Sequence, residues 1–430
     1  MSSNQKSYVV PMIIIGALFF IFGFVTWVNG TLIPYLKIAC QLDSDFQSYL
    51  VATAFFIAYA VMGIPSSFVL KQTGYKKGMS IGLFVMAIGA IIFVPAAQAR
   101  DFNLFLIGLF IIGTGLALLQ TASNPYISII GPIESAANRI SIMGICNKFA
   151  GILAGLIFGY IALKDADAVE QSLLTMDAVA KDAMLDELAS RVIVPYMVIA
   201  GVLVVLAVGI MFSGLPDIKD DGTSDGHDTS LSANKTSVFQ FPHLLLGVLA
   251  MFLYVGVEVM AGDTIISYGK SLGIEMDKAR FLSQLTLAFM LIGYIIGIFT
   301  IPKYMSQSFA LRISAVLGVI FTIGAVVTGG FISVTFIALL GLANALMFPA
   351  IFPLAIDGLG RFTKIGSGLL IMALSGGAIL PLIYGKFLEA VGPKEAYIMM
   401  VPAYLFILYF SISGYRVGRG KAKKVSVPVN

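Results

Sequence analysis

Three ionisable side chains lie inside long apolar stretches of the 430-residue sequence: Lys148, Glu258 and Asp263. If lipid surrounds those stretches, each charge costs on the order of 3 kcal/mol even on the lenient insertion scale, so each calls for a functional hypothesis. Tyr254 and Glu258 are one helical turn apart and share a face, whereas Asp263 points about 140° away on a regular helix. A helix break at Gly262 would let freed carbonyl groups and both carboxylates approach a small hard cation.

These charged residues also have a structural interpretation. Lys148 is the candidate partner of Glu258 in a buried ion pair, and Asp263 suits a position at the membrane interface. From the residues alone, Glu258 and Asp263 are therefore either ion-coupling groups or structural ones.

Uncharged amides form a second set of polar side chains in the apolar stretches: Asn29, Gln120, Asn124, Asn147, Gln284 and Asn344. An amide presents a donor and an acceptor in one plane, which suits the vicinal hydroxyls of a sugar without burying an unpaired charge. Hydrogen bonding between helices is the alternative role for these amides.

The single tryptophan, Trp27, lies within the first apolar stretch rather than at an interface belt. Its ring can stack on the apolar face of a pyranose, and helix packing is again the alternative. We predict a sugar site formed by Trp27, Asn29, Gln120, Asn124, Asn147, Tyr254 and Asn344.

The composition indicates which elements must position these side chains. Apolar residues make up 58% of the chain, charged residues 12%, and the mean hydropathy is +0.95, which excludes an ordinary soluble domain. Apolar stretches of about 20 residues are long enough to cross a bilayer as helices. We predict an all-α membrane protein with twelve transmembrane helices, centred on Ala17, Tyr59, Met86, Ala117, Gly155, Leu203, Met251, Met290, Gly318, Leu340, Leu374 and Leu405.

The longest polar stretch between apolar segments runs from Pro216 to Ser237 and reads as a linker. We predict a six-helix bundle over 1–215, a cytoplasmic linker over 216–240, a second bundle over 241–415 and a basic tail over 416–430. A weak repeat, in which Asn124-Pro125 ends the fourth helix and Phe352-Pro353 ends the tenth, favours two bundles related by pseudo-two-fold symmetry. Such an architecture exposes a central site alternately to each side.

Charge placement predicts the orientation. Most basic residues, including the Lys71–Gly78 loop and the tail, fall on the side of the termini, which we therefore expect to be cytoplasmic. The acidic stretch from Lys164 to Arg191 is then an external loop with a surface helix. The net charge of +4 follows from loop placement, so no nucleic-acid partner is predicted; the bilayer itself is the partner, and the tail meets anionic headgroups.

Motifs of other chemistries are not found. The two cysteines, Cys40 and Cys146, are far apart in sequence, and the two histidines, His227 and His243, lack metal spacing. With no phosphate-binding glycine loop and no serine elbow, we do not expect an enzyme.

Several local patterns give the chain a family resemblance: Phe22-Gly23-Phe24 through Pro34, Gln120 through Tyr126, Gly131-Pro132 to Arg139, Tyr254 through Glu258, and Phe348-Pro349 through Ser367. Over nearly the whole chain, from Phe19 to Phe410, it resembles the fucose:proton symporter family of the major facilitator superfamily. The resemblance implies the major facilitator fold, a monomer in a bacterial inner membrane, and a substrate such as glucose, galactose, mannose or N-acetylglucosamine.

The resemblance also bears on ion coupling. The first-helix aspartate and fourth-helix glutamate that couple protons in fucose permeases are matched by Gly30 and Gln120, which do not titrate, whereas Asn147 matches an asparagine of the sugar cavity. Three possibilities follow: sodium coupling, proton coupling moved to Glu258, or uncoupled diffusion. We favour sodium, with no other cofactor. A major facilitator exporter of amphipathic compounds and a sugar sensor are the rival functions, and the buried amides argue against the exporter.

Overall fold

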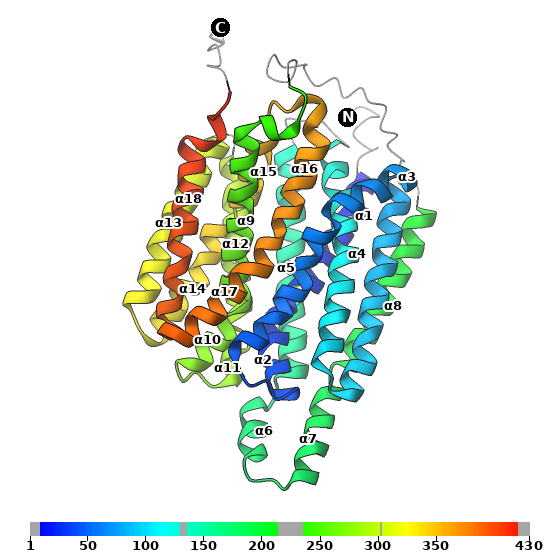
Figure 1. Cartoon of the computed structure of the whole chain (residues 1–430), viewed down its shortest axis with the longest axis vertical. Coiled ribbons are helices and arrows are strands. Elements are labelled where there is room, and N and C mark those ends of the chain that lie inside the picture. The colour runs from blue at the N-terminus through cyan, green and yellow to red at the C-terminus, as the bar shows by residue number, and fades with distance from the viewer. Residues whose placement is uncertain (1–8, 130–135, 214–234, 302, 420–430) are drawn as a thin grey trace.

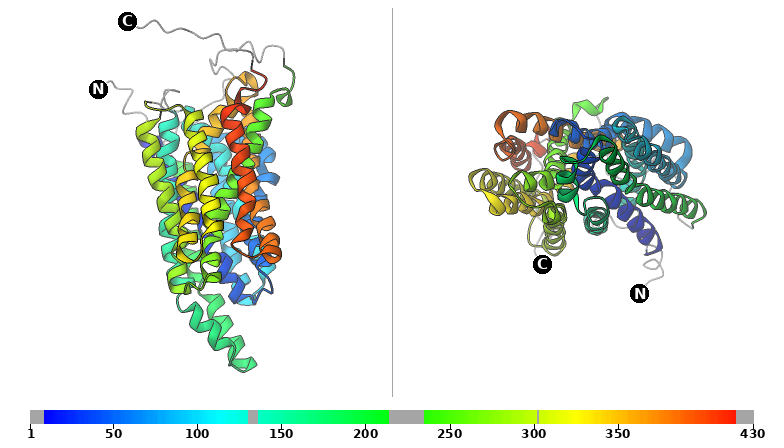
Figure 2. Two further views of the ribbon diagram at one scale, coloured as in Figure 1. Left: turned by 90° about the vertical axis from the view of Figure 1, so that its left-hand side faces the viewer. Right: turned by 90° about the horizontal axis from the view of Figure 1, so that it is seen from below.

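The computed structural model describes residues 9–129, 136–213, 235–301 and 303–419, and all regular structure within them is helical. The long helices run side by side along one axis (Figures 1 and 2). The helices before the predicted linker are α1 (Val9–Trp27), α2 (Asn29–Ala39), α3 (Asp45–Ala99), α4 (Phe102–Ile129), α5 (Ala136–Ala162), α6 (Ala166–Leu173), α7 (Ala178–Ser190) and α8 (Ile193–Phe212).

The helices after the predicted linker are α9 (Pro242–Asp263), α10 (Ile265–Ser271), α11 (Met276–Ala279), α12 (Leu282–Thr300), α13 (Gln307–Val327), α14 (Gly330–Asn344), α15 (Met347–Ile356), α16 (Thr363–Met372), α17 (Gly376–Val391) and α18 (Met400–Ile412). Short 3-10 turns lie between several of these helices, and η5 (Ala373–Ser375) joins α16 to α17.

Eleven helical segments among the described residues are long and apolar enough to span a membrane. One of them, α3, has 55 residues, about 80 Å of helix, which is far more than one crossing needs. Gly74 interrupts it with φ 76° and ψ 171°, a conformation that glycine adopts without strain. The two arms of α3 meet at this turn (Figure 1), so α3 supplies two spans, and the predicted total of twelve is confirmed.

The surface of the bundle suits a lipid solvent. On α8, Val198, Val205 and Phe212 are spaced by seven residues and are 60%, 71% and 81% exposed. This spacing puts them in one stripe of the helix, so α8 presents an apolar face outward along its length. The chain is accordingly a multi-pass membrane protein.

Several spans are broken rather than straight. The first breaks at Val28 between α1 and α2, the seventh at Thr264 between α9 and α10, the tenth between α14 and α15, and the eleventh at η5 between α16 and α17. The first and seventh spans are the opening helices of the two halves. The predicted helix ends at Pro125 and Pro353 are wrong, because α4 continues to Ile129 and α15 to Ile356.

Helix packing groups the elements on either side of the linker. Before it, α1 packs on α5, and α3 on α4 and α8; after it, α13 packs on α14 and α18, and α12 on α14. The contacts between the groups run mainly through α5 with α12 and through α3 with α17. Most of the predicted linker and tail lies outside the described residues, so those domain boundaries stay a prediction.

One end of the molecule carries the short helices. Between Lys164 and Arg191 the structure has two helices, α6 and α7, where the sequence predicted one, and they extend beyond the bundle (Figures 1 and 2). The helix α10 lies at the same end, which we call the α6–α7 end.

Candidate functional site

Trp27, the last residue of α1, brings several predicted site residues together. Its Nε1 donates to Asn147 Oδ1 at 3.2 Å, and Lys148 Nζ lies 4.1 Å from the ring centroid, in cation–π range. A Cβ on Gly151 or Gly262 would lie 2.6 or 2.4 Å from a ring carbon, so only glycine lets α5 and α9 approach this closely. The ring is 4% exposed and fills the space between α1, α5 and α9 in this conformation. Stacking of the ring on a sugar stays a prediction.

A buried ion pair joins α5 to α9. Lys148 Nζ donates to Glu258 Oε1 at 2.9 Å, and the two side chains are only 7% and 10% exposed. Either charge alone would be strongly unfavourable at this depth, so the two stabilise each other. Tyr254 is fully buried one turn before Glu258. The carboxylate of Glu258 is thus engaged by Lys148, which limits what it can offer a metal cation.

Asp263 takes no part in this ion pair. It is the last residue of α9, it is 1% exposed, and its Oδ1 has no hydrogen-bond partner. The predicted break in this helix is present, at Thr264 rather than at Gly262. The two carboxylates are not brought onto one cation, and among the described residues no group of three or more His, Cys, Asp or Glu side chains is arranged to hold a metal ion.

The remaining predicted sugar ligands are on three other helices, α2, α4 and α14. On α4, Gln120 Nε2 donates to Tyr59 Oη at 3.0 Å, and Asn124 is half-buried. Asn344, which ends α14, accepts from Tyr404 Oη at 2.9 Å, while Asn29 on α2 is fully buried with no hydrogen-bond partner for either side-chain atom. The half-buried amides are Gln120, Asn124 and Asn147, and these retain exposed surface.

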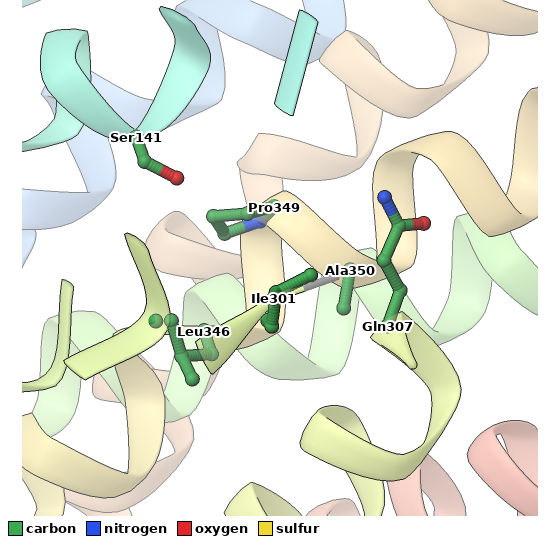
Figure 3. A pocket seen from close by; sticks show the side chains of 7 residues that line it. Ser141, Ile301, Gln307, Leu346, Pro349 and Ala350 are labelled. Atoms are coloured by element: carbon green, nitrogen blue, oxygen red, sulfur yellow. The ribbon is translucent and has the colours of Figure 1, made fainter. Parts of the chain in front are cut away.

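Two cavities stand away from these residues. One of about 20 Å³ is lined by Ser141, Gly297, Ile301, Gln307, Leu346, Pro349 and Ala350 (Figure 3). That volume holds about one water molecule, so it is no sugar site. A groove of about 1050 Å³ at the α6–α7 end is lined by Lys37, Asp165, Asp167, Glu170, Lys181, Glu275, Asp277 and their neighbours. It includes none of the predicted sugar ligands.

Sequence reasoning missed the hydroxyl partners. Tyr59, Tyr404 and Ser283 all lie against predicted site residues, but tyrosine and serine are common inside membrane helices and carry no strong hydropathy penalty. Only the packing of α3, α18 and α12 against neighbouring helices places the tyrosine hydroxyls next to the amides and the Ser283 hydroxyl next to Gly30.

Comparison with known proteins gives a consistent result. A family model described as Major Facilitator Superfamily matches residues 15–382. The chain is 34% identical over 418 residues to a glucose/galactose transporter from Brucella abortus biovar 1 (strain 9-941), with 96% of each chain covered. It is 30% identical over 424 residues to the L-fucose-proton symporter of Escherichia coli (strain K12), covering 96% of this chain and 95% of that one.

The structural comparison agrees. The crystal structure of a Major Facilitator Superfamily transporter, FucP, in the outward conformation matches with a TM-score of 0.73 and 28% identity, covering 94% of this chain and 98% of that one. These matches confirm the predicted all-α fold and the resemblance noted in the sequence.

Proposed function

Since the chain belongs to the Major Facilitator Superfamily, we propose that it is a sugar transporter that carries a hexose, such as glucose or galactose, across a bacterial inner membrane by alternating access. The observation that carries the proposal is the polar contact set around Trp27, which joins α1 and α5 to α9 between the two groups of helices. A site at the interface of two repeats can face either side when the repeats rock. Relatives named as sugar transporters support the substrate class.

Among the predicted sugar ligands, we assign sugar binding to Gln120, Asn124 and Asn147 first. Their half-buried amides have surface left for a ligand, and each amide can both donate to and accept from hydroxyl groups. Trp27, Asn29, Tyr254 and Asn344 are buried in this conformation, so they contact sugar only in a state where the helices around them have separated.

For the coupling ion, we propose a proton in place of the sodium favoured by the sequence. Glu258 is held by Lys148, and the fucose relatives are named as proton symporters. We further propose that the chain acts as a monomer with both termini cytoplasmic. In that orientation the α6–α7 end is periplasmic.

Uptake of labelled sugars into proteoliposomes tests the proposal. Glucose, galactose, mannose and N-acetylglucosamine are each presented with an inward proton gradient, an inward sodium gradient, or neither. We expect saturable uptake of glucose and galactose that accelerates with the proton gradient only. Acceleration by sodium alone would restore the sodium prediction, and equal uptake under all three conditions would make the protein a uniporter. Binding without uptake of any sugar would indicate a sensor.

A further inference from the structure

Three oxygen atoms converge on Gly30 at the start of α2. A Cβ built on Gly30 would lie 3.1 Å from Ser283 Oγ, 3.2 Å from the Gly262 carbonyl oxygen and 3.3 Å from Asp263 Oδ1. Because Gly30 has no side chain, α2 can close over these oxygens of α9 and α12. The result is a small oxygen-lined site whose oxygens take no part in the Lys148–Glu258 ion pair.

Both side chains that supply oxygens to this site are buried. Asp263 and Ser283 are each 1% exposed, and neither Asp263 Oδ1 nor Ser283 Oγ has a hydrogen-bond partner. Buried polar side-chain atoms nearly always have one, so this pair requires a physical explanation. A proton on the carboxyl group provides one for Asp263, because a neutral carboxyl without a partner costs far less to bury than an unpaired carboxylate.

The charges around Asp263 also favour the neutral, protonated carboxyl group. An isolated buried carboxylate costs several kcal/mol unless a cation neutralises it. The charged groups that face Asp263 are Glu258, on its own helix, and Lys148, on α5, and these two neutralise each other. The neighbours from α2 and α12, Gly30 and Ser283, are neutral. No cation therefore remains for Asp263 among the described residues, and the neutral carboxyl fits the site.

We propose that Asp263 is the proton-binding group of the transporter and that α2 closes against α9 and α12 only when Asp263 is protonated. This inference rests on the proton coupling proposed above. A proton from water adds to the carboxylate while the α6–α7 end is open and returns to water when the carboxyl is next hydrated. Closure over an ionised Asp263 would bury an uncompensated charge, so protonation permits the conformational change.

The test compares Asp263→Asn with the wild type in proteoliposomes. The amide is close in shape to a neutral carboxyl but cannot exchange a proton. With one proton per sugar, a gradient of about one pH unit supports at most about a tenfold sugar accumulation, which the wild type should approach. We expect Asp263→Asn to lose this accumulation and to equilibrate sugar only.

Sugar counterflow without a gradient gives a second readout. Raising the pH should slow counterflow by the wild type, because ionised Asp263 blocks closure, whereas counterflow by Asp263→Asn should be independent of pH. Asp277→Asn is the matched control, since it makes the same acid-to-amide change on an exposed side chain of α11 at the same end. It should behave as the wild type in both assays.

The outcomes separate the two proposals. A wild type without proton-driven accumulation would overturn the proton coupling itself. A proton-coupled wild type together with an Asp263→Asn variant that still accumulates sugar, or keeps the pH dependence, would overturn only the assignment to Asp263. Loss of pH dependence in Glu258→Gln but not in Asp263→Asn would move the proton to Glu258.

Discussion

Two acids on one helix, five residues apart, meet different surroundings. Glu258 forms an ion pair with Lys148, while Asp263 lies beside Gly30 and forms no ion pair among the described residues. Their sequence spacing indicated that they point in different directions, but it could not indicate which of them is neutralised. Which acid is neutralised depends on how closely α5 and α2 approach α9. Glycines allow that approach, Gly151 and Gly262 against Trp27 and Gly30 against Asp263.

The ion pair gives a stability prediction. Replacing Lys148 by Met should leave Glu258 buried without a counter-charge and destabilise the protein by about 3–5 kcal/mol. The double variant Lys148→Met/Glu258→Gln removes both charges and should recover much of that loss. Thermal unfolding in detergent measures both. If the double variant were as unstable as the sum of its single variants, the pair would contribute no coupling energy.

The half-buried amides give an affinity prediction. Replacing Gln120 or Asn147 by Ala removes hydrogen bonds worth about 0.5–1.5 kcal/mol each, so sugar affinity should fall about two- to tenfold per variant. Equilibrium binding of labelled glucose measures this fall. Asn103→Ala, an exposed amide near the start of α4, is the control and should bind as the wild type. Unchanged affinity in both site variants would remove these residues from the sugar site.

At the scale of elements, hydropathy located the spans but not their breaks, of which only the one in the seventh span was expected, at Gly262. Apolar length is a local property, so all twelve predicted centres lie in membrane-spanning segments of the structure. The breaks at Val28 and Thr264 depend on neighbours, since Thr264 Oγ1 bonds both the Met260 carbonyl and Tyr397 Oη. The predicted helix ends at Pro125 and Pro353 were wrong for the same reason. A helix breaks at a proline only where neighbouring groups can bond the freed backbone groups.

The short helices at the α6–α7 end form a bridge between the two halves. Lys270 of α10 forms ion pairs with Glu170 and Asp167 of α6, and Asp167 Oδ2 also accepts from the Met276 backbone N–H at 2.6 Å. These side chains are a third or more exposed, so each pair is worth only about 0.2–1 kcal/mol. The bridge is therefore suited to hold this end closed reversibly.

Lys270→Met removes both ion pairs and should shift the equilibrium toward an open α6–α7 end by about two- to thirtyfold, the equivalent of about 0.4–2 kcal/mol. A cysteine at Ser283, in a background with Cys40 and Cys146 replaced by Ala, reports the opening through its alkylation rate. In the protein that retains Lys270, high salt should raise the alkylation rate to near that of the Lys270→Met variant, because salt screens exposed ion pairs. A Met variant that alkylates no faster would show that the bridge does not hold this end closed.

At the scale of the whole molecule, contacts deep between the halves suggest that the linker acts only as a tether. Lys148 with Glu258, Trp27 with Gly262, and the Thr53 hydroxyl donating to the Ala378 carbonyl at 2.8 Å join the halves independently of residues 216–240. A tether between two binding parts raises their effective concentration but adds no contact.

Co-expression of residues 1–220 and 232–430 as separate chains should therefore restore hexose uptake, whereas neither chain alone should transport. Uptake by intact cells and co-purification of the two chains measure the result. The membrane confines both chains to one plane and so keeps their local concentration high. Expression of both chains therefore has to replace only part of the effective concentration that the linker provides. If both chains inserted and co-purified without transport, the predicted linker would act in the transport cycle itself. If they inserted without co-purifying, the contacts between the halves would be too weak to hold the two chains together. The regions 1–215 and 241–415 would then not be bundles that assemble on their own.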